Sequence, residues 1–213
     1  MNGVFITASN TEVGKTTVAV EIARRLSEKR IVKARKPAES DCPIVDSKLA
    51  PRDAIALSDA CGNVEPLAMV CPFCFEMEAS AEKASSATGE TLTLDMLVEA
   101  CRQGVGDDFA LVEGAGGFYS PIAEKVLNAN LAVELGLPLV VVVRDELGAI
   151  SQALLTLGAA EKNNLSVACV VLNQVENNEL SNIDALKAYT NTPVVCFSLA
   201  DLDRFWADIE RLI

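Results

Sequence analysis

Short, almost entirely apolar runs alternate along the chain with segments whose apolar residues recur every three or four positions. The apolar runs have the length and composition of buried strands, and the recurring pattern is typical of amphipathic helices. The predicted strands cover residues 4–8, 31–35, 109–112, 139–143, 167–172 and 194–197. The predicted helices cover residues 16–26, 53–60, 93–102, 150–160 and a closing segment over 201–213.

Continuous apolar strands separated by helices indicate a mostly parallel sheet with helices on both faces, which is a three-layer α/β fold. The chain has 213 residues, and it contains no internal repeat, low-complexity tract or linker. We therefore expect a single domain over residues 1–213. Ligands of such folds gather beyond the carboxyl ends of the strands.

A phosphate-binding motif lies between the first strand and the first helix. Residues 8–16 read ASNTEVGKT and match G-x-x-x-x-G-K-[ST] except at Ala8, where glycine is usual. In such a loop, backbone N–H groups and the helix N-terminus bind phosphates. Lys15 then reaches the β- and γ-phosphates, and Thr16 ligates Mg²⁺. The motif predicts a P-loop nucleotide site, with Ala8 at negative φ because alanine is disfavoured at positive φ.

Charged residues follow two other predicted strands. Glu113 ends a strand and is followed by Gly114, Ala115 and Gly116, which permits a ligand to approach the backbone closely. An acid in this position of a P-loop protein is a candidate Mg²⁺ ligand. Lys36 follows the second strand, and Asp53 opens a helix just after Pro51. Taken singly, Lys36 is typical of a surface lysine and Asp53 of a helix-dipole partner.

Composition excludes several classes of function. The net charge is −12 with no basic stripe, so we expect no nucleic-acid partner. No apolar run approaches the roughly 18 residues of a membrane helix, and the first residues lack a secretory pattern, so we expect a cytoplasmic protein with no membrane contact. The chain has no histidine, which excludes Ser-His-Asp and Cys-His catalysis and histidine-ligated zinc.

The seven cysteines are an odd number and are scattered, which predicts reduced, mostly buried thiols. Cys71 and Cys74 have C-x-x-C spacing. A zinc site would require two further ligands at similar spacing, and none are present. A redox motif would be expected to open a helix beside a thioredoxin-like βαβ unit. We therefore interpret this pair as structural thiols.

The order and spacing of these motifs resemble the dethiobiotin synthetase family over most of the chain. The specific segments are TEVGKT at residues 11–16 and VEGAGG at 112–117. The segment KPAES at 36–40 and the helix opened by Asp53 support the resemblance. Asn10 occupies the position where partitioning and metal-delivery ATPases carry a second lysine, which argues against that branch of the P-loop superfamily.

The resemblance implies an ATP-dependent ligase that closes the ureido ring of dethiobiotin from 7,8-diaminopelargonic acid and CO₂ in biotin synthesis. It implies that Lys15 holds the β- and γ-phosphates and that Lys36 stabilises the carbamate and the transferred phosphoryl group. It also implies a Mg²⁺ site and sites for ATP and the diamine. The Mg²⁺ ligands would be Thr16, Asp53 and Glu113. The diamine would be placed by Thr11, Glu12 and Ser40. The ATP site would comprise Glu12, Val13, Gly14, Lys15, Thr16, Thr17, Asp53, Glu113, Gly114, Ala115, Gly116 and Asn173.

The family forms homodimers with the active site at the interface. The resemblance implies that the substrate carboxylate meets a helix N-terminus of the partner subunit. The corresponding residues here would be Gly148, Ala149, Ile150 and Ser151.

Two other functions stay open at the level of sequence. One is a related P-loop ligase that forms amides on a larger acid, although 213 residues leave no room for the glutaminase domain that such enzymes carry. The other is a non-catalytic, nucleotide-dependent switch. The second alternative is motivated by Ser151 and by residues 79–82, which depart from the family pattern.

Overall fold

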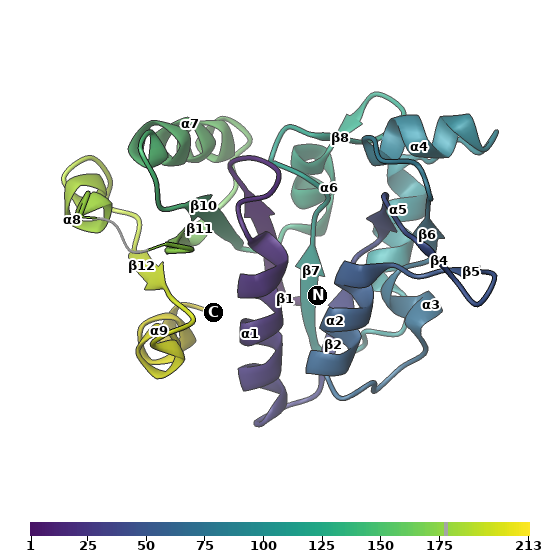
Figure 1. Ribbon diagram of the computed structural model, residues 1–213, viewed down its shortest axis with the longest axis horizontal. Coiled ribbons are helices and arrows are strands. Elements are labelled where there is room, and N and C mark those ends of the chain that lie inside the picture. Colours follow the sequence, from purple (N-terminus) through teal and green to yellow (C-terminus); the bar gives the residue numbers. More distant parts are fainter. Residues whose placement is uncertain (177–178) are drawn as a thin grey trace.

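The computed structural model describes residues 1–176 and 179–213 and has a six-stranded parallel sheet at its centre (Figure 1). The strand order is β12-β11-β10-β1-β7-β2. The strands of this sheet are β1 (Asn2–Ala8), β2 (Val32–Arg35), β7 (Phe109–Glu113), β10 (Leu139–Arg144), β11 (Val167–Asn173) and β12 (Val194–Phe197). All six agree with the strands predicted from the sequence, and the three-layer P-loop-like fold is confirmed.

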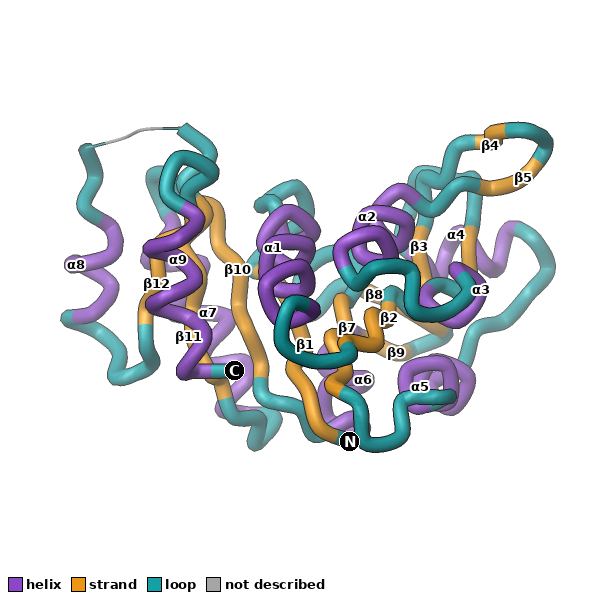
Figure 2. The backbone as a smooth tube through the Cα atoms, turned by 90° about the horizontal axis from the view of Figure 1, so that it is seen from below, coloured by secondary structure: helices purple, strands orange, loops and turns teal. Residues whose placement is uncertain are grey.

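Helices cover both faces of the sheet, as Figure 2 shows in a view from below. One face packs against α1 (Lys15–Ser27), α2 (Arg52–Ala60), α3 (Leu67–Val70) and α9 (Leu202–Ile209). The other packs against α4 (Ala81–Ala87), α5 (Leu94–Arg102), α6 (Asn128–Leu135), α7 (Ala149–Lys162) and α8 (Asn182–Lys187). A 3₁₀ turn, Glu210–Leu212, follows α9. The five predicted helices are present, and α3, α4, α6 and α8 are additional.

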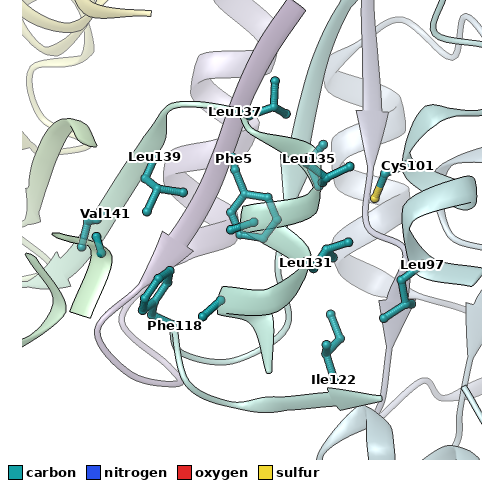
Figure 3. Packing of buried hydrophobic residues seen from close by; sticks show 14 of the residues in the cluster. Phe5, Leu97, Cys101, Phe118, Ile122, Leu131, Leu135, Leu137, Leu139 and Val141 are labelled. Atoms are coloured by element: carbon teal, nitrogen blue, oxygen red, sulfur yellow. The ribbon is translucent and has the colours of Figure 1, made fainter. Parts of the chain in front are cut away.

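The alternation of side chains along the strands divides the core into two clusters. In β1, Val4 and Ile6 face the cluster around α1, whereas Phe5 faces the cluster around α6. Figure 3 shows Phe5 among Leu131, Leu135 and other apolar side chains of that second cluster. Apolar residues on both faces explain why the strands read as continuous hydrophobic runs.

Three short strand pairs lie outside the central sheet. The segment between Lys36 and Pro51 contains β3 (Ala38–Glu39) and a hairpin of β4 (Ile44–Val45) and β5 (Lys48–Leu49). Strand β3 pairs in parallel with β6 (Phe73–Cys74). Strands β8 (Pro121–Ala123) and β9 (Val126–Leu127) form a second hairpin. Ser40, which follows β3, and Pro121 of β8 line a cavity together with Thr11 of the phosphate loop.

No helix in residues 1–176 and 179–213 is both long and apolar enough to cross a membrane.

Candidate nucleotide and substrate site

The phosphate loop joins β1 to α1, and its backbone resolves the question raised by Ala8. Ala8 ends β1 in extended conformation and is paired with Val142, so the prediction of a negative φ is confirmed. The left-handed conformations fall later in the loop, at Glu12 (φ 58°) and Gly14 (φ 81°). Gly14 is the N-cap of α1. A Cβ at Gly14 would lie 2.0 Å from Nδ2 of Asn173, so this position requires glycine.

Two buried lysines converge on one carboxylate oxygen. The Nζ atoms of Lys15 and Lys36 each lie 2.6 Å from Oε1 of Glu113. Lys15 comes from the first turn of α1, Lys36 from the end of β2 and Glu113 from the end of β7. These strands are neighbours in the sheet, with β1 beside β7 and β7 beside β2, so their carboxyl ends bring the three side chains together.

Asp53 and Thr16 complete this charged cluster. Oδ2 of Asp53 accepts a hydrogen bond from Lys36 Nζ at 2.8 Å, and the Thr16 hydroxyl donates to Glu113 Oε1 at 2.9 Å. Asp53 is held by the N-terminus of α2, whose Asp53 and Ala54 N–H groups donate to the buried carboxylate of Glu39 at 2.9 and 3.0 Å. Two positive and two negative side chains thus balance one another where α1, α2, β2 and β7 meet.

Burial and the neighbouring charges shift the pKa values of the cluster. The pKa of Lys15 is lowered to about 8, because burial and the Lys36 charge together outweigh the opposing effects of Glu113 and Asp53. For Lys36, burial is outweighed by Glu113 and Asp53, which raise its pKa. Burial would raise the pKa of Glu113 and Asp53, but the two lysines lower both. The lysines and carboxylates therefore stabilise one another in their charged forms near neutral pH.

Two adjoining cavities open around the phosphate loop. One of about 290 Å³ lies over the charged cluster. The next, of about 350 Å³, extends towards the start of α4 and includes Ser40, whose hydroxyl donates to the Ala79 carbonyl at 2.6 Å. Thr11, Glu12 and Gly116 line both cavities. The first cavity is lined by Asn10, Thr11, Glu12, Gly14, Lys15, Thr16, Lys36, Asp53 and Gly116, and the second by Thr11, Glu12, Ser40, Glu78, Ala79, Ser80, Ala81, Ala115, Gly116, Ser120 and Pro121.

A third cavity, of about 530 Å³, lies on the other side of the loop. The predicted residues Thr17 and Asn173 line it together with Glu12 and Gly14. Nδ2 of Asn173 donates to the Val13 carbonyl at 2.8 Å, which ties β11 to the phosphate loop. The remaining lining comes from Arg144, Gln174, Val175, Phe197, Ser198, Leu199 and Ala200. The loop before α9, rather than α9 itself, borders this cavity.

The segment Gly148 to Ser151 lies outside these three cavities. Gly148 caps α7 with φ 97°, and Ala149 is buried. Gly148, Ile150 and Ser151 border a separate cavity of about 640 Å³, with Leu147, Leu154, Leu155 and Asn182. Within one chain, these four residues are therefore not brought together with the phosphate loop.

The side chains predicted to bind Mg²⁺ are suited to that ion. They offer two carboxylates and a hydroxyl, which are hard oxygen donors. Oε2 of Glu113 is buried and has no hydrogen-bond partner in the described part of the chain, and the Asp53 side chain is 38 % exposed. Residues 1–176 and 179–213 contain no group of three or more His, Cys, Asp or Glu side chains arranged as a metal site. Mg²⁺ typically takes one or two carboxylates and completes its shell with water and phosphate oxygens.

Two residues that organise the site were not predicted from the sequence. Asn128 is fully buried; its Nδ2 donates to the carbonyls of Ala115 and Gly117, and its Oδ1 accepts from the Ala115 N–H. It thereby holds the glycine-rich loop after Glu113. Glu39 also went unrecognised, although a carboxylate shortly before a helix is a signal that could have suggested its capping role. For Asn128, the sequence carries no comparable signal.

Comparison with known proteins agrees with this geometry. The AAA domain family matches residues 2–197. A protein of Vesicomyosocius okutanii, named ATP-dependent dethiobiotin synthetase BioD, is 45% identical over 213 residues, covering 100% of this chain and 97% of its own length. A Ruthia magnifica protein of the same name is 44% identical over 213 residues, covering 100% and 99%. An Aeromonas hydrophila protein of that name is 31% identical over 195 residues, covering 89% and 86%.

Solved structures share the fold at low sequence identity. A ParA family ATPase from Chlorobium tepidum aligns with a TM-score of 0.54 and 12% identity, over 100% of this chain and 92% of that one. The septum site-determining protein MinD from Pyrococcus horikoshii, complexed with Mg-ADP, aligns with a TM-score of 0.54 and 16% identity, over 98% and 87%. These likenesses concern the fold alone. The full-length sequence similarity shows that this chain belongs to the dethiobiotin synthetase family.

Proposed function

We propose that this protein is an ATP-dependent ligase that forms dethiobiotin from 7,8-diaminopelargonate and CO₂. The observation that carries the proposal is the convergence of Lys15 and Lys36 on Glu113 beside two adjoining cavities. One cavity is lined by the phosphate loop and both lysines, and the other adjoins it along Thr11, Glu12 and Gly116. ATP and a second substrate could therefore meet at Lys36. We further propose that residues 1–213 act as one domain, since both core clusters share the strands of one sheet.

The reaction requires an anion to attack the γ-phosphate of ATP. One amine of the substrate captures CO₂ as a carbamate and loses a proton. A carbamate oxygen then attacks the γ-phosphorus, ADP leaves, and a carbamic-phosphoric mixed anhydride forms. The second amine attacks the carbonyl carbon, closes the ureido ring and expels phosphate. In this proposal Lys15 binds the β- and γ-phosphates, and Lys36 stabilises both the carbamate and the transferred phosphoryl group.

Mg²⁺ would be held by Thr16, Asp53 and Glu113. When bound, it neutralises phosphate charge. The chain's own contribution is positioning: the sheet places two ammonium groups where negative charge accumulates, and α2 presents Asp53. The absence of histidine is compatible with this chemistry, because lysines, carboxylates and the substrate amines supply the charged and proton-carrying groups.

The remaining predicted contacts belong to the same proposal. Glu12, Val13, Gly14, Thr17, Gly114, Ala115, Gly116 and Asn173 would surround ATP. Thr11, Glu12 and Ser40 would place the diamine in the cavity of about 350 Å³. Gly148, Ala149, Ile150 and Ser151 would bind the substrate carboxylate of the partner subunit in a homodimer, with N–H groups at the start of α7. Exposed Leu147 and Leu155 beside them support an interface there.

The test is incubation of the protein with diaminopelargonate, bicarbonate, ATP and Mg²⁺, followed by mass spectrometry. We expect dethiobiotin together with one ADP and one phosphate for each ring closed. Tight ATP binding without dethiobiotin would overturn the proposal. If diaminopelargonate binding were also undetectable by calorimetry, a nucleotide-dependent switch would become the better description.

A further inference from the structure

Three thiols meet beside the charged cluster and take no part in the proposed reaction. The sulfurs of Cys71 and Cys74 lie 3.5 Å apart, within van der Waals contact. Cys42 donates a hydrogen bond to the Glu39 carbonyl oxygen at 3.4 Å and interacts electrostatically with Cys74. Cys71 and Cys42 are buried, whereas Cys74 is partly exposed on β6. Within the described part of the chain, β6 pairs with β3 and with no other strand.

The pair has the chemical asymmetry of a reactive dithiol. The two sulfurs share one hydrogen bond, and this contact lowers the pKa of Cys74 although burial acts to raise it. The same contact, together with burial, raises the pKa of Cys71. The more accessible sulfur therefore carries more thiolate character, and thiolate is the form that attacks a disulfide. Cys71 lies behind it in position to complete an exchange.

Backbone hydrogen bonds connect this dithiol to Lys36. The Lys36 N–H donates to the carbonyl of Val70, the residue before Cys71, at 2.8 Å. Cys74 is paired with Glu39 between β6 and β3, and the Phe75 N–H donates to the Glu39 carbonyl at 2.9 Å. The segment of residues 70–75 is thus hydrogen-bonded to the backbone of Lys36, which precedes β3, and to that of Glu39, which ends β3. A change in the backbone conformation of residues 70–75 would therefore displace Lys36 through Val70 and Glu39 through Phe75.

In place of the purely structural role expected from the sequence, we propose that Cys71 and Cys74 form a reversible disulfide with each other. Small disulfides such as glutathione disulfide would be the oxidant, and the bond would lower turnover at Lys36. The Cys74 thiolate attacks one sulfur of glutathione disulfide and releases one glutathione as thiolate. The Cys71 thiol loses its proton, attacks Cys74 Sγ in the mixed disulfide and releases the second glutathione. The two thiols lose two electrons and two protons, and the oxidant is reduced to two glutathione molecules.

The bond requires movement of the segment that holds Lys36. The two sulfurs must approach from 3.5 Å to about 2 Å. Reacting groups that are misplaced by about 1 Å can cost on the order of 10² in rate. We therefore expect oxidation to reduce turnover about tenfold or more, and reduction with a dithiol to restore it. The effect on turnover rests on the proposed ligase function, whereas formation of the bond does not.

The experiment uses the full-length reduced protein, treated with glutathione disulfide, alkylated and mapped by peptide mass spectrometry. We expect a Cys71–Cys74 link in the wild type and none in Cys74→Ser. Cys196→Ser is the matched control, because Cys196 is also partly exposed; it should form the link and lose turnover as the wild type does. Cys71→Ala is a second variant that blocks the bond if Cys74→Ser does not fold.

A peptide map with no Cys71–Cys74 link, or with Cys74 linked to Cys42 instead, would overturn the proposal. So would a complete link with unchanged turnover. If the reduced protein makes no dethiobiotin, the ligase proposal fails separately. Hydrogen exchange at the Lys36 amide then measures the coupling between the disulfide and Lys36. The exchange rate should change on oxidation in the wild type and stay constant in Cys74→Ser. The same response to oxidation in both proteins would contradict the coupling.

Discussion

Lys15 and Lys36 differ in electrostatics although both are buried and both contact the same oxygen of Glu113. Lys36 has a second carboxylate, Asp53, at 2.8 Å, so its charged form is favoured. Among the described residues Lys15 has no second carboxylate in direct contact, and burial together with the Lys36 charge lowers its pKa to about 8. Lys36 is thus the more firmly charged of the two lysines, and Lys15 is the one whose charge depends on pH.

Replacing Lys36 tests its role in turnover. Lys36→Ala should reduce kcat by about 10²–10³, by analogy with the loss of one donor to developing charge. Lys33→Ala is the control, because Lys33 lies on the same strand but pairs with Glu65 and Asp108 away from the cavity. Steady-state kinetics should show near wild-type turnover for Lys33→Ala. Equal kcat values in the two variants would refute the assignment of Lys36.

The lowered pKa of Lys15 predicts a pH-dependent stability. Between pH of about 8 and 10.5, the unfolded chain holds the Lys15 proton and the folded chain does not. The Lys15 contribution to the free energy of unfolding therefore rises with pH across this window, by on the order of 1–3 kcal/mol. Below about pH 8 Lys15 is protonated in both the folded and the unfolded chain, and its buried charge lowers the free energy of unfolding.

The measurement is urea unfolding of the wild type and Lys15→Met at pH 7.5 and 9.5. Buried thiols act in the opposite direction, because their raised pKa values cause stability to be lost as pH rises above about 9. The Lys15 effect is therefore the difference between the two proteins, in which the thiol contribution cancels. Identical pH dependence of both proteins would contradict the lowered pKa.

At the scale of elements, α2 depends on a residue outside the helix. Its N-cap, Pro51, makes no side-chain capping bond. The carboxylate of Glu39, on β3, accepts from the Asp53 and Ala54 N–H groups instead. A negative charge at a helix N-terminus is also favoured by the helix dipole. Glu39 thereby joins β3 to the helix that presents Asp53.

Glu39→Ala should therefore reduce both stability and turnover. We expect a loss of about 1 kcal/mol in the free energy of unfolding, as for other lost caps. Thr93→Ala is the control, because Thr93 accepts from the Met96 N–H at the start of α5. Both variants should lower the free energy of unfolding, and only Glu39→Ala should raise the Mg²⁺ concentration needed for half-maximal turnover. A similar effect of both variants on Mg²⁺ would assign Glu39 a purely structural role.

At the scale of the whole molecule, the parallel sheet gathers residues that are distant in the sequence. Lys15 and Glu113 are 98 positions apart, and Lys36 and Glu113 are 77 apart. Strand order places β1, β7 and β2 side by side, so their carboxyl ends form one edge. The start of α7 lies on that edge but borders a different cavity. Its proposed role therefore depends on a second copy of the chain.

Disrupting the proposed dimer tests that dependence. Leu155 on α7 is 73% exposed, and Leu155→Glu should shift the sedimentation profile from dimer to monomer and reduce turnover. Ile31→Glu is the control, because Ile31 is also exposed but precedes β2 near the opposite edge of the sheet. That variant should sediment as the wild type does. A wild-type protein that sediments as a monomer while making dethiobiotin would contradict the proposed interface.

Continuous apolar strands and periodic amphipathic helices could be predicted from the sequence. Elements that form only through contact with another segment could not. The six strands of the sheet are short apolar runs that need no partner to be recognised. Strands β3 and β6 have two residues each and exist through pairing with one another. Helix α6 has its buried residues Ala129, Leu131, Ala132 and Leu135 distributed without a wide polar face, so its periodicity is weak. Such elements are stabilised by packing rather than by local propensity.

The sequence by itself determined the chemistry available to this protein. It specified the phosphate loop, the two lysines, the carboxylates at element ends and the absence of histidine, because these are matters of residue type and spacing. Only the tertiary structure decided which charges meet. Lys15 and Lys36 share Glu113, Glu39 caps α2, Asn128 holds the glycine-rich loop and three thiols lie together. Each of these contacts joins segments that become neighbours only when strand order and helix packing are established, and no local pattern encodes that order.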